Sequence, residues 1–174
     1  MTGQVKEDVL SDVKAIENDF NVQVTPLWQG DAEIDDLMVK FKDACAQFGA
    51  KDRKIMLLHH TYVGSDAADA DRAAQELSTF YNYFGAWFQN KRPVANGFIE
   101  EIPMADMAAN KMMAPATLRR DLTIGTTQEV IDRIKRYEDL GYDEFSFWID
   151  SGMSTERKRA SLARFIDDVM PAFT

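Results

Sequence analysis

The sequence predicts an α/β fold in which about three parallel strands alternate with flanking helices. Apolar residues recur every three or four positions in several segments, which is the spacing of one face of a helix. Between these segments lie short runs rich in β-branched and aromatic residues, which favour strands. Alternation of this kind is typical of parallel strands joined by right-handed crossovers. The chain shows no internal repeat or low-complexity linker, so we expect a single domain, 1–174.

The N-terminal part predicts two helices with a strand between them. Apolar positions spaced by three and four predict an amphipathic helix over roughly 4–19. The β-prone run at 21–28 predicts the first strand, which Pro26 interrupts. Asp31 is the expected N-cap of the next helix, and Gly49 is its expected stop.

The middle of the chain contains the clearest strand. Residues 54–63 form a near-continuous apolar run, which is typical of a strand covered on both faces in a parallel sheet. A turn then opens a long helix predicted from Ala67 to Phe88. Three prolines and one glycine interrupt 91–122: Pro93, Gly97, Pro103 and Pro115. We therefore expect an irregular segment there, with a short helix or two.

The C-terminal part returns to regular structure. Thr126 and Glu129 form a capping-box pattern, in which the hydroxyl and the carboxylate satisfy helix-start amides reciprocally. Gly141 is the expected end of the helix that this box begins. The remaining expected elements are a strand over 143–150 and a final helix from 154 or 155 to about Val169, closed by Pro171.

Charge and composition argue against several classes of protein. The formal net charge of −9 repels phosphodiester backbones, so we expect no nucleic-acid partner. No window approaches the roughly 18 uninterrupted apolar residues that span a bilayer, so we expect no membrane partner. The acidic N-terminus lacks the apolar core of a secretory signal, and Cys45 has no second cysteine to pair with. Both features favour a cytoplasmic location.

Three stretches occur together in a recognisable order and spacing. They read VTPLWQGD (24–31), IGTTQEVIDRIKRYEDLGYDEFSFWID (124–150) and RKRASLARFIDDVMPAF (157–173). The resemblance described next rests on three features of these stretches: the Ile-Gly-Thr opening, the helix that ends in Leu-Gly and the terminal Val-Met-Pro-Ala-Phe. Together these stretches resemble the C-terminal part of the luciferase-like flavin monooxygenases, most specifically over 123–173.

The resemblance implies a fold as well as an ancestry. The family forms an eight-stranded (β/α) barrel of the TIM type, so the strands here would be its sixth (22–27), seventh (54–63) and eighth (143–149). Residues 91–122 would fall in an excursion that covers the active site in the family. A barrel needs roughly 200–250 residues or more, so this chain is expected to form a partial barrel. We therefore expect a homo-oligomer, or a partner that supplies the missing barrel half.

The same resemblance directs attention to the C-terminal ends of the strands, where barrel enzymes place their active sites. His60 is the candidate catalytic residue, as an acid, base or hydrogen-bond donor. Trp148 and Arg119 are candidate flavin contacts, with the ring and the phosphate respectively. Trp28 and Tyr62 are candidates for the substrate pocket. Weaker candidates at or near these positions are Thr25, His59, Lys91, Arg92, Arg120 and Asp150.

Each candidate also has a purely structural interpretation. His59 and His60 are adjacent on a strand and point to opposite faces, so they cannot jointly chelate a metal, and we expect no metal site. Either histidine can be a buried core residue that is hydrogen-bonded to a backbone carbonyl. Trp28 and Trp148 can equally be core aromatics, and Arg119 can be part of a solvated surface.

The resemblance implies oxygen insertion into a small organic substrate, with reduced FMN as cofactor and a flavin reductase as a possible partner. The chain would then be a C-terminal portion or a truncated form of such a monooxygenase. Two alternatives stay open: a non-catalytic relative that binds flavin or a partner, and an oligomerising fragment without an activity of its own. Whether the chain is itself an enzyme is therefore not decided by the sequence.

Overall fold

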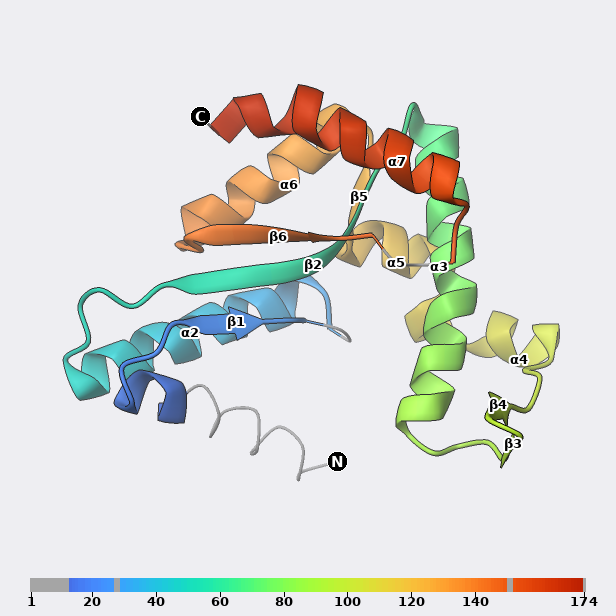
Figure 1. Ribbon diagram of the computed structural model, residues 1–174, viewed down its shortest axis with the longest axis horizontal. Coiled ribbons are helices and arrows are strands. Elements are labelled where there is room, and N and C mark those ends of the chain that lie inside the picture. Colours follow the sequence, from blue (N-terminus) through green and yellow to red (C-terminus); the bar gives the residue numbers. More distant parts are fainter. Residues whose placement is uncertain (1–12, 27–28, 150–151, 174) are drawn as a thin grey trace. The chain divides into compact units, whose positions relative to one another are not determined.

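The computed structural model describes residues 13–26, 29–149 and 152–173 of the chain (Figure 1). The chain divides into two compact units, and each is described by itself. Unit 1 comprises Met1–His59 and Arg133–Trp148, and unit 2 comprises His60–Asp132 and Ile149–Thr174. No helix among the described residues is long and apolar enough to cross a membrane.

Unit 1 is built around the first part of strand β2 (Ile55–Val63). Strand β1 (Val22–Val24) pairs with β2 in parallel, with Val22 opposite Ile55. Strand β6 (Glu144–Trp148) also pairs with β2. Helix α2 (Asp31–Phe48) follows β1 and buries four residues spaced by three and four: Ile34, Met38, Phe41 and Ala44. This spacing places them on one face of the helix, which forms the core of unit 1 together with β1 and β2.

Polar contacts fix the ends of these elements. The Tyr142 hydroxyl donates to the Ile34 carbonyl over 2.8 Å, and the Asp143 carboxylate accepts from the Ile55 amide over 2.9 Å. Helix α6 (Thr127–Leu140) stops at Gly141, whose φ of 108° is accessible to glycine at little cost.

The single cysteine, Cys45, is half-buried against this core as a free thiol. Burial raises its pKa, as does Asp143 more weakly, while Arg53 opposes the shift.

Unit 2 is organised around the last residues of β2. Strand β5 (Thr123–Gly125) pairs with them in parallel, with Thr61 opposite Thr123 and Val63 opposite Gly125. Helix α3 (Ala67–Phe88) packs on α5 (Pro115–Asp121) (Figure 1). Its alanines at 70, 73 and 74 are buried. Such small side chains let the helix approach its neighbours closely.

Helix α7 (Thr155–Arg164) is attached to the end of β2. Its N-cap, Ser154, accepts from the Arg157 amide. The Ser161 hydroxyl accepts from the Val63 amide, and Arg164 donates to the Val63 carbonyl, each over 2.8 Å. These bonds satisfy backbone groups that a longer strand partner would otherwise take.

The segment between α3 and β5 contains a hairpin and short helical pieces. Strands β3 (Val94–Ala95) and β4 (Phe98–Ile99) form a hairpin whose two turn residues, Asn96 and Gly97, both have positive φ. This is the geometry that Asn-Gly turns favour. Helix α4 (Met104–Ala109) and the 3₁₀ turn η1 (Lys111–Met113) follow before α5.

The predicted fold class is confirmed: the described residues form an α/β structure with parallel pairing in the order β1-β2-β5 and flanking helices. Helix 67–88 has the predicted bounds, and the predicted strand 54–63 is present at Ile55–Val63. Residues 13–17 are helical, as the predicted first helix requires, and its earlier residues lie outside the described ones. The first strand is shorter than predicted, since β1 spans Val22–Val24.

Three details of the prediction were wrong or incomplete. Strand β5 was not predicted, because three residues are too few to show an alternating pattern. Asp31 is not the N-cap of α2; Gly30 holds that position with φ 56°, and Asp31 instead lies 3.7 Å from Arg133 and from Arg136. The C-terminal helix is not closed by Pro171 but continues as a π-helical turn η2 (Phe165–Val169) and a 3₁₀ turn η3 (Met170–Phe173).

Candidate functional site

The carboxyl ends of β2 and β5 lie side by side in unit 2. The two strands are joined there by a bond of 2.7 Å from the Gly64 amide to the Gly125 carbonyl. Helix α3 begins directly after β2, and α6 begins directly after β5. Three of the predicted site residues, His60, Tyr62 and Arg119, belong to this unit. The candidate site is therefore built from these strand ends and the helices that follow them.

Carboxylates of the chain itself occupy both helix starts. Asp66 is the N-cap of α3 and accepts from the Asp69 amide over 2.8 Å. At the start of α6, Glu129 Oε2 accepts from the Thr126 amide over 2.7 Å and from the Thr126 hydroxyl over 3.0 Å. The glutamate half of the predicted capping box is thus confirmed, while the threonine hydroxyl donates to the same carboxylate. These contacts compensate the partial positive charge of each helix start.

Tyr62, a predicted substrate-pocket residue, is the centre of a charged cluster. It is 1% exposed, and its hydroxyl donates to Asp69 Oδ2 over 2.9 Å. Arg157 of α7 donates to Asp69 Oδ1 over 2.9 Å and also forms an ion pair with Glu76. The Arg157 guanidinium carbon lies 5.2 Å from the centre of the Tyr62 ring, which adds a cation–π contact. One arginine thereby connects α7, α3 and the end of β2.

The cluster shifts the pKa values of its members. Burial raises the pKa of Tyr62, and the hydrogen bond to Asp69 raises it further against the opposing charge of Arg157. Burial opposes ionisation of Asp69, but hydrogen bonds from the Ser65 amide, Tyr62 and Arg157 outweigh it and lower the pKa of Asp69. Asp69 and Arg157 are therefore both charged at neutral pH, and Tyr62 is a neutral donor.

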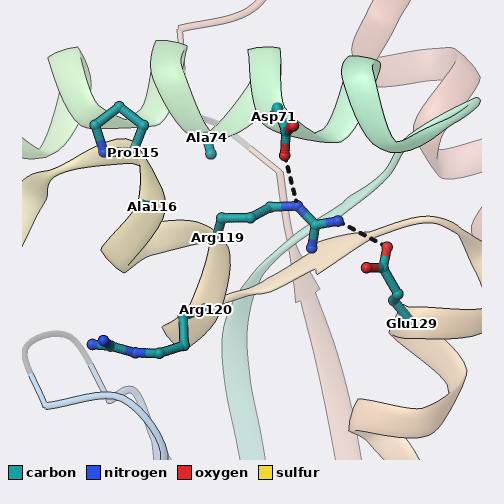
Figure 2. A pocket seen from close by; sticks show the side chains of 7 residues that line it. All are labelled: Asp71, Ala74, Pro115, Ala116, Arg119, Arg120 and Glu129. Carbon is teal, nitrogen blue, oxygen red and sulfur yellow. Dashed lines mark hydrogen bonds and ion pairs between the residues drawn. The ribbon is translucent and has the colours of Figure 1, made fainter.

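Arg119 is the centre of a second cluster (Figure 2). Its Nε donates to Asp71 Oδ1 over 3.3 Å, and its Nη2 donates to Glu129 Oε2 over 2.8 Å. A third bond runs from Nη1 to the Ile124 carbonyl. Gly125 permits this arrangement, because a Cβ atom there would lie 2.7 Å from the Glu129 Cβ. Arg119 thus joins α3, β5 and α6.

A pocket of about 510 Å³ lies beside this cluster. Its lining residues come from α3, α5 and α6 and are Asp71, Ala74, Pro115, Ala116, Arg119, Arg120 and Glu129. Figure 2 shows Asp71 and Glu129 approaching the Arg119 guanidinium from different elements, while Arg120 extends away from it. Arg120 pairs with Asp121 over 2.6 and 2.8 Å.

The two histidines of β2 contact different elements, as their adjacency on a strand requires. His60, the predicted catalytic residue, is 1% exposed, and its Nδ1 faces the Tyr81 hydroxyl of α3. His59 Nδ1 lies 3.4 Å from the Tyr137 hydroxyl of α6. Each histidine is therefore buried and faces a tyrosine hydroxyl. Among the described residues, no group of His, Cys, Asp or Glu side chains is arranged to hold a metal ion.

The remaining predicted residues are placed elsewhere. Trp148 is half-buried at the end of β6 in unit 1. Trp28 and Asp150 lie outside the described residues. Sequence reasoning missed Asp69, Asp71 and Arg157, which carry most of the ion pairs of the site. A signal for the first two existed: they are acidic residues near the start of a helix that follows a buried strand.

Comparison with known proteins supplies the context for this site. Residues 21–144 match the family model described as luciferase-like monooxygenase. The oxygenase component of a flavin-dependent trigonelline monooxygenase from Acinetobacter baylyi is 53% identical over 161 residues, which are 92% of this chain and 45% of that protein. The chain therefore spans less than half the length of this relative.

Solved structures agree on the fold. The monooxygenase RslO1 from Streptomyces bottropensis superposes with a TM-score of 0.67 and 17% identity, over 95% of this chain and 46% of that one. The second is the oxygenating constituent of 3,6-diketocamphane monooxygenase from Pseudomonas putida, a type II Baeyer–Villiger monooxygenase in complex with FMN. It superposes with a TM-score of 0.62 and 14% identity, over 92% of this chain and 45% of that one. At such identities the likeness concerns the fold alone.

Proposed function

The chain belongs to the luciferase-like monooxygenase family, and on this premise we propose that it serves in the oxygenase of a two-component flavin-dependent monooxygenase. The observation that carries the proposal is the 53% identity to an oxygenase component over nearly the whole of this chain. The proposed reaction inserts one oxygen atom into a small organic substrate. Trigonelline, an N-methylated pyridinium carboxylate, is the first substrate to test, since the relative is named for it.

Reduced FMN is the proposed cofactor, and a separate flavin reductase is the proposed partner. The description of the relative as an oxygenase component supports a reductase, because such a component receives its reduced flavin from another protein. A structural neighbour that carries FMN supports the identity of the flavin. When bound, the reduced flavin supplies the electrons that activate oxygen, and the protein supplies binding, orientation and exclusion of water.

Arg119 and the starts of α3 and α6 do not fit the flavin phosphate. Arg119, the predicted phosphate contact, already donates to Asp71, Glu129 and the Ile124 carbonyl. The starts of α3 and α6 are occupied by Asp66 and Glu129. A phosphate dianion placed there would meet carboxylates before it met donors. We therefore do not place the flavin phosphate at Arg119 or at these two helix starts.

The other site residues keep the roles proposed from the sequence. His60 is the proposed acid, base or donor, with Tyr81 orienting its ring. Trp148 is the proposed flavin neighbour, and Trp28 and Tyr62 are the proposed walls of the substrate pocket. For Tyr62 this role concerns the ring, because the hydroxyl is held by Asp69.

Isotope labelling tests the proposed function. The purified protein is mixed anaerobically with photoreduced FMN and trigonelline, and the reaction is started with ¹⁸O₂. We expect a product that carries one ¹⁸O atom, detected by mass spectrometry, and none without protein. Hydrogen peroxide formation with no labelled product, in a protein that binds reduced FMN, would contradict the proposal.

A non-catalytic flavin-binding relative is the second candidate. The observation that favours it over a catalyst is the burial of His60, the proposed catalytic residue, which is 1% exposed and faces the Tyr81 hydroxyl. Binding of FMN without labelled product is the expected outcome for this candidate. Absence of binding to both oxidised and reduced FMN would contradict both functions.

A further inference from the structure

Helix α7 and the turns η2 and η3 follow one another without a break and carry an exposed apolar row (Figure 1). Leu162, Ile166 and Met170 are 41%, 51% and 46% exposed and follow one another at intervals of four residues. On a helix, side chains at this spacing form a continuous ridge. Single exposed apolar side chains are ordinary, whereas a contiguous row is typical of a surface that another molecule covers.

The apolar ridge is separate from the contacts by which α7 is attached to unit 2. Ser161 and Arg164 bond to the backbone of Val63. Arg157 pairs with Asp69. Ser161 is fully buried by this attachment, while the three apolar side chains of the ridge stay exposed. The attachment of α7 therefore leaves the ridge facing solvent.

A second ridge runs beside the apolar one and has opposite charges at its two ends. It consists of Arg159, Ala163 and Asp167, again at intervals of four residues, and all three are exposed. Eight residues of helix span about 12 Å, so Arg159 and Asp167 are too far apart to pair within one copy. Among the residues that the structure describes, neither of them takes part in an ion pair.

This charged ridge is complementary to itself. The formal net charge of −9 makes two copies repel each other, so a contact between copies needs opposite charges where they meet. Ala163 lies midway between Arg159 and Asp167 in the chain. A twofold axis at Ala163 would set two antiparallel helices side by side, with each arginine opposite the partner's aspartate. The short side chain of Ala163 would let the two helices approach closely at the axis.

From these two ridges we infer that α7 binds α7 of a second copy of this chain, antiparallel and with the twofold axis at Ala163. The apolar ridges pack next to the axis, and two Arg159–Asp167 pairs form on either side of it. The inference goes beyond the proposed function, since it requires neither flavin nor turnover. One pair of helices covers a small area, so the dissociation constant is expected in the micromolar range.

Sedimentation equilibrium of the purified full chain tests the apolar ridge. Ile166→Lys places a charge within the ridge, whereas Val39→Lys makes a comparable change at a 56% exposed position on α2. We expect Ile166→Lys to raise the dissociation constant at least about tenfold and Val39→Lys to leave it unchanged. Circular dichroism verifies that both variants are folded. Equal effects of the two variants, or no self-association of the unmodified chain, would overturn the inference.

Charge exchange tests the antiparallel pairing. Arg159→Glu sets a carboxylate opposite Asp167 at both contacts of a dimer, and Asp167→Lys sets an ammonium group opposite Arg159. Reversal is used because removal of one exposed charge costs little. We expect each variant alone to associate at least about tenfold more weakly than the unmodified chain. An equimolar mixture of the two restores opposite charges at both contacts, so its association should return to within about threefold.

The mixture distinguishes this pairing from other sources of self-association. The two variants change the net charge in opposite directions, so a general charge effect cannot weaken both. A mixture that associates as weakly as its components would overturn the antiparallel arrangement. Variants that associate as tightly as the unmodified chain would show that self-association uses another surface, and would overturn the inference as well.

Discussion

Arg157 and Asp69 form an ion pair of 2.9 Å that joins the first turn of α7 to the first turn of α3. Both side chains are largely buried, at 21% and 15% exposure. The same arginine pairs with Glu76 and covers the Tyr62 ring. A contact of this kind does more for stability than a surface ion pair, because removing one partner leaves other charges partly buried without compensation.

Replacement of Arg157 tests how much this cluster contributes to the free energy of unfolding. We expect Arg157→Ala to lower the free energy of unfolding by about 2–3 kcal/mol, because Asp69 and Glu76 lose their shared partner. Urea denaturation followed by circular dichroism measures the change. Arg159→Ala removes a neighbouring exposed arginine and should change the stability by less than about 0.5 kcal/mol. Similar losses in the two variants would contradict the structural weight given to Arg157.

The depressed pKa values of Asp69 and Glu129 predict acid sensitivity. Their ordinary values are 3.8 and 4.5, and both are lowered in the folded protein. As the pH falls, the unfolded state therefore takes up protons before the folded state does. The stability that these two carboxylates contribute is fully present above their ordinary pKa values and is lost as the pH falls through their folded pKa values. We expect the unfolding free energy to drop as pH falls below about 5. Asp69→Asn should flatten this dependence; an unchanged slope in that variant would contradict the assignment.

Gly125 is predicted to be intolerant of a side chain. In Gly125→Ala the new Cβ would lie 2.7 Å from Glu129 Cβ, so the start of α6 must shift and loosen the Arg119 contacts. We expect a loss of about 1–3 kcal/mol in unfolding free energy. Gly152→Ala is the control: it has positive φ but no neighbouring atom within 4 Å, so its cost of about 1 kcal/mol is from the backbone alone. A smaller loss at Gly125 than at Gly152 would contradict the packing argument.

The proposed role of His60 is tested against its neighbour on the strand. His59 and His60 are equally buried and contact different tyrosines, so His59→Asn controls for the loss of a buried ring. In a preparation that turns over, we expect His60→Asn to lower kcat about a hundredfold, as removal of an acid or base does. His59→Asn should lower kcat far less at equal folded fraction. Equal effects of the two variants would assign His60 to the core and not to catalysis.

Self-association is expected from the exposed edge and the exposed apolar side chains. Among the described strands β1 pairs with β2 alone, and an edge strand templates further pairing. Large apolar side chains are also exposed on unit 2, including Trp87, Phe98 and Met104. We predict a homodimer or a larger oligomer at micromolar concentration. Light scattering after size exclusion checks this, and a folded monomer would contradict it.

Local sequence patterns predicted the long elements well. Helices α2 and α3 and strand β2 were readable because apolar spacing, glycine stops and β-branched runs all favoured the same structure. Strand β5 was not readable, since its three residues become a strand only by pairing with the end of β2. The hairpin at 94–99 was missed although its Asn-Gly pair is a hairpin signal, because the prolines and glycines around it favoured an irregular segment.

The site was less predictable than the fold. Arg119 was noticed as a possible phosphate contact, but nothing local in the sequence indicates that Asp71 lies next to it in the fold. Likewise Arg157 is 88 positions from Asp69 in the chain, and only the tertiary structure brings them together. Capping was readable because its partners are three residues apart, whereas ion pairs between elements depend on the tertiary structure.

The solitary thiol of Cys45 offers a natural reporter of local opening. The thiolate is the form that attacks alkylating reagents, and the raised pKa of Cys45 keeps that form scarce at neutral pH. Its partly covered position on α2 slows reagents further, so labelling accelerates when α2 detaches from its neighbours. Since the sequence contains one cysteine, every adduct reports on unit 1. The rate of local opening of this unit can therefore be measured in the unmodified protein, without an engineered probe.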